Sequence, residues 1–428
     1  MENRRYNVLL VVVDCLRYSA LQELLNENKL PVTGKLLEKS TYFTSAYATS
    51  TTTTPSFTTI LSGLYPAKHG VRSLQGYRVS RDLVLVQELL AANNYYTRAE
   101  VTGPLMEVIG LNRGFKDYVF REQYETVYTS WWKKFLDTLD SIPKPWFILL
   151  HLWELHRPRK LPPNKNTLKN RLYDDFRYKQ ALVYLDEKLG ELYDKIREDT
   201  VIILTGDHGE LTPRTFFENL RALSVRGYRK IMRILVSKGL KWFEKYARRP
   251  LREVGHGFHV YEYLVHVPLI IYTPSGSKKI YDGLVSHVDI VPTLLDLVGV
   301  EERPYYPLDG LSLKPVVVDN KRIEHDYVFM EACGVDLKLE ECIVGIRTHK
   351  YKLAMRPLAR DKHLELYDLE EDPHETRNLA SQRPEIVKQL LGILEKEYLK
   401  YYYSPGLLFK IYRLKKKLRT SQLTPRRV

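Results

Sequence analysis

Uninterrupted apolar runs divide the chain and predict the strands of a buried sheet. Three runs, at residues 7–13, 146–151 and 200–204, consist almost entirely of aliphatic, β-branched and aromatic residues. Strands that are covered on both faces have this continuous pattern, whereas half-exposed strands alternate apolar and polar residues. We therefore expect these runs to be central, mostly parallel strands.

Helical spacing of apolar residues separates these runs. It predicts helices at residues 21–37, 82–92 and 173–193, and a short strand is expected at 41–43. Strands that alternate with helices are typical of an α/β domain with helices on both faces of one sheet. From about residue 325 the pattern changes to short strands, at residues 327–331, 342–347 and 351–355, followed by a helix at 384–401. We expect a large α/β domain over 1–324 and a small C-terminal α+β subdomain over 325–400.

A run of hydroxyl residues, Thr49 to Thr54, directly precedes Pro55 and an apolar stripe at helical spacing. Proline is tolerated in the first turn of a helix, so the pattern predicts a helix whose N-terminus lies beside these hydroxyls. Unpaired backbone N–H groups and the helix dipole make such an end a good place for an anionic group. A threonine run that only caps a helix would have the same pattern.

Polar residues follow two of the predicted strands. Asp14 comes directly after residues 7–13, and Asp207 and His208 follow 200–204. In open α/β sheets ligands bind beyond the carboxyl ends of the strands, so these side chains are expected to meet at one edge. Two carboxylates, one imidazole and a threonine oxygen are suitable ligands for a divalent cation.

Three ordered motifs resemble the site motifs of the sulfatase-like branch of the alkaline phosphatase superfamily. They are NVLLVVVDCLR at 7–17, TTPSF at 53–57 with SGLYPAKHG at 62–70, and TGDHGE at 205–210. Further segments are similar in the same order, at 112–115, 154–158, 261–271, 286–293, 347–352 and 365–373. The resemblance implies an alkaline phosphatase/sulfatase-like α/β fold with a mostly parallel sheet.

The resemblance also implies a metal site and a nucleophile. The ligands of one divalent ion would be Asp14, Thr53, Asp207 and His208. Hydrolytic sulfatases have Cys-x-Pro-Ser-Arg, whose cysteine becomes formylglycine, but here Thr53 and Phe57 replace the Cys and the Arg. The nucleophile would then be the Thr53 hydroxyl, ionised by the metal as in the phosphate-handling members.

Further residues match substrate-binding positions of that family. His156 is at the position of a histidine that contacts the substrate oxyanion or the leaving group, and Arg17 ends the first motif. A histidine near residues 255–259 would also contact the substrate, and we consider both His256 and His259, with His256 favoured. Asp186 is expected to cap or pair structurally.

The resemblance implies one metal ion. A two-metal site would need an aspartate four residues before His156, where the chain has Leu152. One imidazole among oxygen ligands favours manganese or zinc, with calcium or magnesium as alternatives.

Composition adds little about the chemistry. Hydrophobic residues make up 44% and charged residues 28% of the 428 residues, which is ordinary for a globular protein. The three cysteines, Cys15, Cys333 and Cys342, fit no zinc signature or disulfide framework, and Cys15 is expected to be a packed thiol. No apolar run approaches the ~18 residues of a membrane span, and no signal-like segment precedes the first strand. We therefore expect a cytoplasmic protein, with contact at the inner face of the membrane as the alternative.

The net charge of +14 is concentrated in two segments. Residues 211–254 have twelve Lys/Arg and three Asp/Glu, a net of +9, and residues 401–428 have eight Lys/Arg and no acids. Together these give +17, so the remainder is about −3. Both segments have apolar residues at helical spacing, which predicts a basic helical insertion at 211–254 and a basic amphipathic tail. Such a tail can lie on an anionic membrane.

Three functions remain open at this point. A hydrolase of sulfate or phosphate esters is favoured, acting on a small-molecule, glycan or lipid-linked substrate. A phospho-group transferase resembling the phosphoglycerol and phosphoethanolamine transferases would use the same ligand set. A nucleic-acid-binding protein is permitted by the pI of about 9.3, but the chain lacks a recognition motif and keeps the ligand set, so this class is disfavoured.

Overall fold

The computed structural model describes residues 5–165, 174–196, 198–213, 255–335, 339–359 and 363–404, together with residues 231, 234, 235, 237–240, 406, 408 and 409. Most of the predicted 211–254 insertion and of the 401–428 tail lies outside these residues. Leu408 and Phe409 are described at the start of the tail, and both are buried against the main core. Within the described part of the chain, no helix is both long and apolar enough to cross a membrane.

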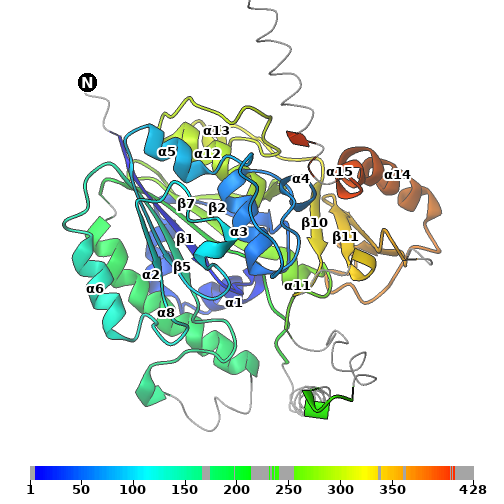
Figure 1. Cartoon of the computed structure of the whole chain (residues 1–428), viewed down its shortest axis with the longest axis horizontal. Coiled ribbons are helices and arrows are strands. Elements are labelled where there is room, and N and C mark those ends of the chain that lie inside the picture. Colours follow the sequence, from blue (N-terminus) through cyan, green and yellow to red (C-terminus); the bar gives the residue numbers. More distant parts are fainter. Residues whose placement is uncertain are drawn as a thin grey trace, which may run out of the picture.

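A nine-stranded, mostly parallel sheet forms the centre of the molecule (Figure 1). Its order is β4-β3-β5-β1-β6-β7-β2-β8, and β9 pairs with β2. Its strands are β1 Asn7–Val13, β2 Ser40–Tyr47, β3 Tyr96–Val101, β4 Asp117–Phe120, β5 Trp146–Leu152, β6 Thr200–Gly206, β7 His266–Tyr272, β8 Lys279–Tyr281 and β9 Val285–Ser286. Only β7 runs antiparallel to its neighbours. The predicted α/β fold with a largely parallel sheet is confirmed.

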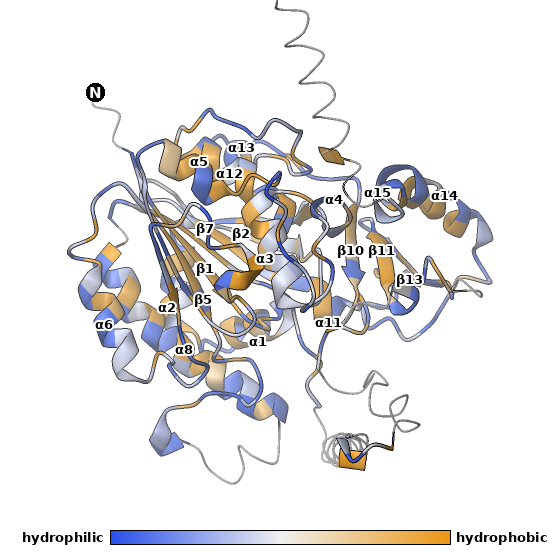
Figure 2. Ribbon diagram, viewed as in Figure 1, coloured by the Kyte–Doolittle hydropathy of each residue, from blue (hydrophilic) through white to orange (hydrophobic). Residues whose placement is uncertain are grey.

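Helices cover both faces of this sheet (Figure 1). Those packed with Val8, Leu10 and Val12 are α3 Thr53–Ser62, α5 Val86–Ala92 and α12 Ile290–Leu297, with α13 Lys314–Val317 beside them. Those packed with Leu9, Val11 and Val13 are α1 Tyr18–Asn26, α2 Pro31–Leu37, α6 Ser130–Thr138 and α8 Asp174–Ile196. Alternate residues of β1 therefore pack on opposite faces, which explains why the strand is apolar throughout (Figure 2).

The predicted helix at 21–37 is two helices. The break lies between Asn26 and Pro31, where Asn28 has a φ of +53° and Pro31 begins α2. The Asp186 carboxylate accepts hydrogen bonds from the backbone N–H groups of Val32 and Thr33, both at 2.9 Å. Asp186 therefore caps the first turn of α2, in agreement with the structural role expected for it.

A second, antiparallel sheet of four strands lies beside the main sheet. It contains β10 Val328–Ala332, β11 Ile343–Arg347, β12 Tyr351–Met355 and β13 Glu365–Asp368, and is covered by α14 Pro384–Leu394, which continues through a π-helical turn into α15 Lys400–Tyr402. The predicted small C-terminal sheet and helix are present.

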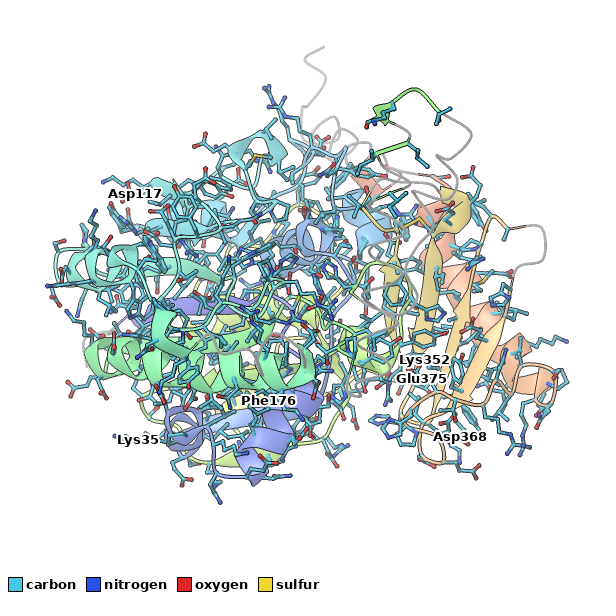
Figure 3. All side chains as sticks on the ribbon, turned by 90° about the horizontal axis from the view of Figure 1, so that it is seen from below. Lys35, Asp117, Phe176, Lys352, Asp368 and Glu375 are labelled. Atoms are coloured by element: carbon cyan, nitrogen blue, oxygen red, sulfur yellow. A yellow bond between two sulfur atoms is a disulfide. The ribbon has the colours of Figure 1, made fainter. Side chains whose placement is uncertain are left out.

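A buried lysine joins the two sheets. The Lys352 ammonium on β12 donates to Val260 O at 2.8 Å and to Glu262 at 2.9 Å, and also pairs with Glu375. Figure 3 shows Lys352 and Glu375 next to each other at this boundary. Glu262 begins α11 Glu262–Val265, directly before β7. The C-terminal sheet is thus attached to the main sheet through buried charge pairs as well as apolar contacts.

Cys333 and Cys342 form a disulfide. The expectation that the cysteines fit no disulfide framework is therefore wrong for this pair. The register of β10 and β11 places Ala332 opposite Ile343, so the next residues of the two strands, Cys333 and Cys342, face each other with Cα atoms 4.3 Å apart. Sequence spacing alone does not reveal this pairing.

Candidate active site

The predicted ligand residues meet at one edge of the main sheet. β1 and β6 are adjacent and parallel, with Val13 opposite Gly206, so Asp14 and Asp207 leave the sheet side by side. β2 ends at the same edge, and the chain then enters α3 at Thr53. All four predicted ligands, Asp14, Thr53, Asp207 and His208, are buried.

The Thr53 hydroxyl lies between an aspartate and a histidine. Thr53 Oγ1 donates to Asp14 Oδ2 at 3.1 Å and lies 3.4 Å from His208 Nε2. His208 Nε2 is in turn 3.3 Å from Asp207 Oδ2. Donor atoms of Asp14, Asp207 and His208 all lie within 4.8 Å of one another. The structure therefore brings the four side chains into one cluster.

The charges of this cluster fit a bound cation. Burial and the neighbouring Asp14 charge raise the pKa of Asp207 well above its usual range. Burial opposes ionisation of Asp14 as well, but the hydrogen bond with His151 and the nearby imidazoles hold its pKa below the usual value. Asp207 Oδ2 is buried and has no hydrogen-bond partner among the described residues. An orphaned carboxylate oxygen beside a second carboxylate is costly without a positive partner, so the residues present fit a divalent cation.

Two further histidines lie against this cluster. The His256 ring centroid is 4.3 Å from that of His208 and 5.7 Å from that of His156. Each has its Nδ1 at a backbone carbonyl, at 2.8 Å from Arg157 O for His156 and 3.2 Å from Thr51 O for His256. A carbonyl can only accept, so Nδ1 has the proton and Nε2 has the lone pair of the neutral ring. Burial lowers the pKa of His256 to about 3, which keeps that ring neutral.

The remaining predicted substrate ligands have other partners. His259 Nε2 pairs with Glu365 at 3.0 Å, and its ring stacks on Tyr261 with centroids 3.6 Å apart. Of the two alternatives, His256 is therefore the histidine in contact with His208. Arg17 pairs with Asp175 at 2.9 Å and lies over the Tyr178 ring. Substrate contacts by Arg17 and His259 stay predictions.

Nearby arginines are also paired. Arg159 is buried and pairs with Glu210, and with Asp174 at 3.0 Å. Arg157 pairs with the same two carboxylates. These guanidinium charges are neutralised locally, which leaves little net positive charge for the cluster around Thr53.

Two residues at the site were missed or assigned a lesser role from the sequence. His151, inside β5, is fully buried, and its Nε2 lies 3.5 Å from Asp14 Oδ2. One ionisable residue at the end of an apolar strand does not by itself indicate a site, because the contact with Asp14 depends on β5 lying next to β1. Cys15 is buried as expected, but its Sγ donates to Asp14 Oδ1 at 2.9 Å and so belongs to the site.

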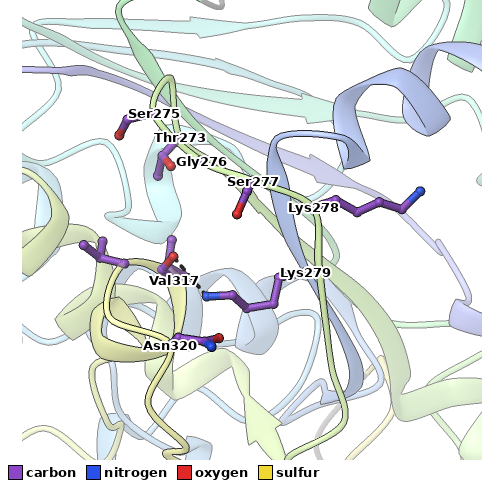
Figure 4. Close-up of a pocket in the computed structure, with 9 residues that line it drawn as sticks. Thr273, Ser275, Gly276, Ser277, Lys278, Lys279, Val317 and Asn320 are labelled. Carbon is purple, nitrogen blue, oxygen red and sulfur yellow. Dashed lines mark hydrogen bonds between the residues drawn. The ribbon is translucent and has the colours of Figure 1, made fainter.

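A separate hollow of about 470 Å³ lies at the opposite end of the sheet, where the antiparallel strand β7 ends (Figure 4). Its two lysines are already engaged. Lys278 pairs with Glu38 at 2.7 Å, and Lys279 donates to Val316 O at 2.6 Å. None of the nine residues that line it belongs to the cluster around Thr53.

Comparison with known proteins gives consistent matches. The sulfatase family matches residues 6–300, and the C-terminal family of N-sulphoglucosamine sulphohydrolase matches residues 256–401. A choline-sulfatase of Rhizobium meliloti is 31% identical over 211 residues, which are 47% of this chain and 32% of that protein. The match thus spans about a third of the length of this relative.

Solved structures agree on the fold. A 2-O GAG sulfatase has a TM-score of 0.68 at 18% identity, covering 93% of both chains. The phosphonate monoester hydrolase of Agrobacterium radiobacter has a TM-score of 0.67 at 18% identity, covering 93% of this chain and 96% of its own. The family match includes every residue of the cluster around Thr53 and more than half of the chain, which therefore belongs to the sulfatase family.

Proposed function

We propose that the protein hydrolyses sulfate or phosphate esters with the Thr53 hydroxyl as nucleophile, at a divalent ion held by Asp14, Thr53, Asp207 and His208. The observation that supports this most directly is the position of Thr53 Oγ1 between Asp14 Oδ2 and His208 Nε2, at the first residue of α3. Names of similar proteins, a choline-sulfatase and a phosphonate monoester hydrolase, fall within the same class of ester chemistry.

In the first half of the reaction, Thr53 Oγ1 attacks the sulfur or phosphorus atom. A bound divalent ion would lower the pKa of the hydroxyl and offset the charge of the ester oxygens. The Thr53 proton passes first to Asp14 Oδ2, which accepts its hydrogen bond, and then through the Nε2 lone pair of His256 to the departing ester oxygen, so that an alcohol is released. The product is a covalent Thr53 ester.

In the second half, water attacks the Thr53 ester. His256 takes the proton of the water and returns it to Thr53 Oγ1, which regenerates the hydroxyl and releases sulfate or phosphate. His156 Nε2 and the N-terminal N–H groups of α3 would contact the equatorial oxygens through both steps.

The local charge supports a preference for esters with one negative charge. Arg17, Arg157 and Arg159 are each paired with a carboxylate, and Phe57 occupies the position where hydrolytic sulfatases have an arginine. Two carboxylates and one divalent ion leave the site close to neutral. Sulfate monoesters and phosphodiesters are monoanions, so their binding in a nearly neutral site leaves less uncompensated buried charge than binding of a dianionic phosphate monoester.

The test is turnover of an aryl sulfate, an aryl phosphodiester and an aryl phosphate monoester by the metal-loaded protein, side by side. We expect the two monoanionic esters to react faster, and Thr53→Ala to lower kcat by at least about 10³-fold. Thr53→Ser, which keeps a hydroxyl, is the matched control and should retain measurable turnover.

Two outcomes would change the proposal. Turnover that survives in Thr53→Ala would rule out the covalent Thr53 ester and indicate direct attack by water. If the metal-loaded protein turns over none of the three esters, the result would favour the phospho-group transferase, which needs its own acceptor alcohol.

A further inference from the structure

Cys15 has a backbone conformation that an ordinary packed thiol does not require. Its φ is +63°, in the left-handed region, which is unfavourable for a residue that has a Cβ atom. The turn is held by Asp207, whose Oδ1 accepts a hydrogen bond from the Cys15 backbone N–H at 3.0 Å. This strained conformation lies beside the predicted metal ligands Asp14 and Asp207, and it fixes the direction in which the Cys15 side chain points.

The Cys15 sulfur lies among the donor atoms of the site. Sγ, one ring nitrogen of His208 and one of His256 all lie within 4.8 Å of one another, and Sγ forms a second such group with Asp14 and His156. Ligand atoms bound to one zinc ion at about 2.0–2.3 Å are roughly 3.3–3.8 Å apart in a tetrahedral site. Only a small contraction would bring sulfur and nitrogen onto a common ion.

Two independent observations indicate that an ion is expected here. Asp207 Oδ2 is buried, lies 3.3 Å from His208 Nε2, and has no hydrogen-bond partner in the part of the chain that the structure describes. His208 has its Nδ1 committed to Gly209 O at 2.9 Å, which leaves Nε2 as the nitrogen with a lone pair. Both atoms belong to the residues that surround the Cys15 sulfur.

We propose that Cys15 binds the divalent ion as a thiolate and thereby selects a borderline-soft ion, such as zinc or cobalt, over calcium and magnesium. This inference rests on the metal centre of the proposed function. On binding, the S–H bond breaks, the sulfur–metal bond forms and the proton leaves to the buffer. Thiolate sulfur favours zinc and cobalt, whereas oxygen-only ligand sets suit calcium and magnesium, so one thiolate shifts the preference of the whole site.

The experiment is a titration of the metal-free full-length protein with Co²⁺, followed by ultraviolet and visible absorption. A cobalt–thiolate bond gives a sulfur-to-metal charge-transfer band in the near ultraviolet, separate from the visible ligand-field bands. We expect the wild type to show both. Competition titrations should show that zinc displaces cobalt and that calcium does not.

Substitutions identify the sulfur atom. Cys15→Ser should lose the near-ultraviolet band and bind zinc at least tenfold more weakly, whereas Cys15→Asp should gain affinity for calcium relative to zinc. The double variant Cys333→Ser/Cys342→Ser is the matched control, because it leaves Cys15 as the only cysteine and should keep the band.

The outcomes separate the two proposals. Visible cobalt bands without the near-ultraviolet band in the wild type would overturn the role of Cys15 and leave the metal centre of the proposed function intact. A protein that binds neither cobalt nor zinc would overturn the metal centre, and the role of Cys15 with it. Both results come from the wild type, so they do not depend on whether a variant folds.

Discussion

Thr53 Oγ1 and Asp14 Oδ2 are joined by a 3.1 Å hydrogen bond although the residues are 39 positions apart in the sequence. The bond connects the end of β1 with the first residue of α3, so it depends on the order of strands in the sheet and on the loop after β2. The same Asp14 oxygen lies 3.5 Å from His151 Nε2 on the neighbouring strand β5. One carboxylate oxygen thus faces both the proposed nucleophile and a buried imidazole.

His151 is therefore expected to act through Asp14. His151→Phe keeps an aromatic ring beside Phe57, where the rings already meet edge to face, but removes the nitrogen atoms. Loss of an imidazole that supports a metal ligand typically lowers metal affinity or activity by about 10–100-fold. Metal competition titrations would measure the loss of affinity, and steady-state kinetics the loss of kcat. His349→Asn is the control, because the His349 side chain is half-exposed. A change below twofold in both metal affinity and kcat would show that His151 does not support Asp14.

His256 and His259 offer a matched pair of substitutions. His256→Asn should lower kcat by about 10²-fold or more if the ring moves the Thr53 proton. His259→Asn should leave kcat within a few-fold and lower the melting temperature instead, because Glu365 would lose the imidazole that, against the effect of burial, holds its pKa near 2. A large loss of kcat in His259→Asn with little loss in His256→Asn would instead indicate that His259 contacts the substrate.

The buried pair at the boundary of the two sheets predicts a pH dependence of stability. Burial and the neighbouring Glu262 charge outweigh Lys352 and raise the pKa of Glu375 to about 7. The folded protein therefore keeps a proton that the unfolded chain loses near the ordinary value of 4.5. Because the folded state binds more protons in this window, stability falls as the pH rises from about 4.5 to about 7.

Glu375→Gln tests this, since the amide is neutral at every pH. Between pH 5 and 8 the variant should gain on the order of 1–3 kcal/mol of stability relative to the wild type. Thermal or urea unfolding at several pH values would measure the difference, and Glu370→Gln, at an exposed ion pair, is the control. Parallel pH profiles for the wild type and Glu375→Gln would contradict the assignment.

The sequence predicted the central strands well because their covered position leaves a simple signal. β1 is buried on both faces, so every position from Val8 to Val13 is apolar, and the polar residue that follows marks the edge of the sheet. Asp14, Asp207 and His208 were found in this way. The ligand cluster thus follows from strand ends and parallel topology.

Other features depend on pairing in space and have no local signal. Cys333 meets Cys342 only through the register of β10 and β11. Arg17 is held by Asp175, which lies 158 residues further along the chain. His151 resembles an ordinary strand residue until β5 is placed next to β1. Such contacts require the fold before they can be recognised.

Asp186 should stabilise the fold without affecting the chemistry. Its carboxylate accepts three hydrogen bonds at the start of α2, from the N–H groups of Val32 and Thr33 and from the Thr33 hydroxyl. Asp186→Ala leaves these donors unpaired and should cost about 1–2 kcal/mol of stability. Asp186→Asn keeps an acceptor and should cost less. Unfolding curves measure the loss, and kcat should stay unchanged in both variants. A loss of activity at full stability would contradict a purely structural role.

The Cys333–Cys342 disulfide lies beside the segment that follows α4 Pro66–His69, and this segment contacts the first turn of α3. Gly334 O accepts a hydrogen bond from Leu74 N at 3.1 Å, and Leu74 O accepts one from the Thr54 hydroxyl at 2.9 Å. Closing a short loop of sequence separation 9 stabilises a protein by about 2–3 kcal/mol on the chain-entropy account.

We expect Cys333→Ser/Cys342→Ser to melt several degrees lower than the oxidised wild type. A reductant should lower the melting temperature of the wild type toward that of the variant, while leaving the variant unchanged. Through Leu74, the disulfide-linked segment is connected to Thr54, the residue next to Thr53. The variant should therefore also lose part of its kcat, by a few-fold. Removal of the nucleophile is expected to lower kcat far more, by a factor of about 10³. Equal melting temperatures with and without reductant would show that the pair does not contribute to stability.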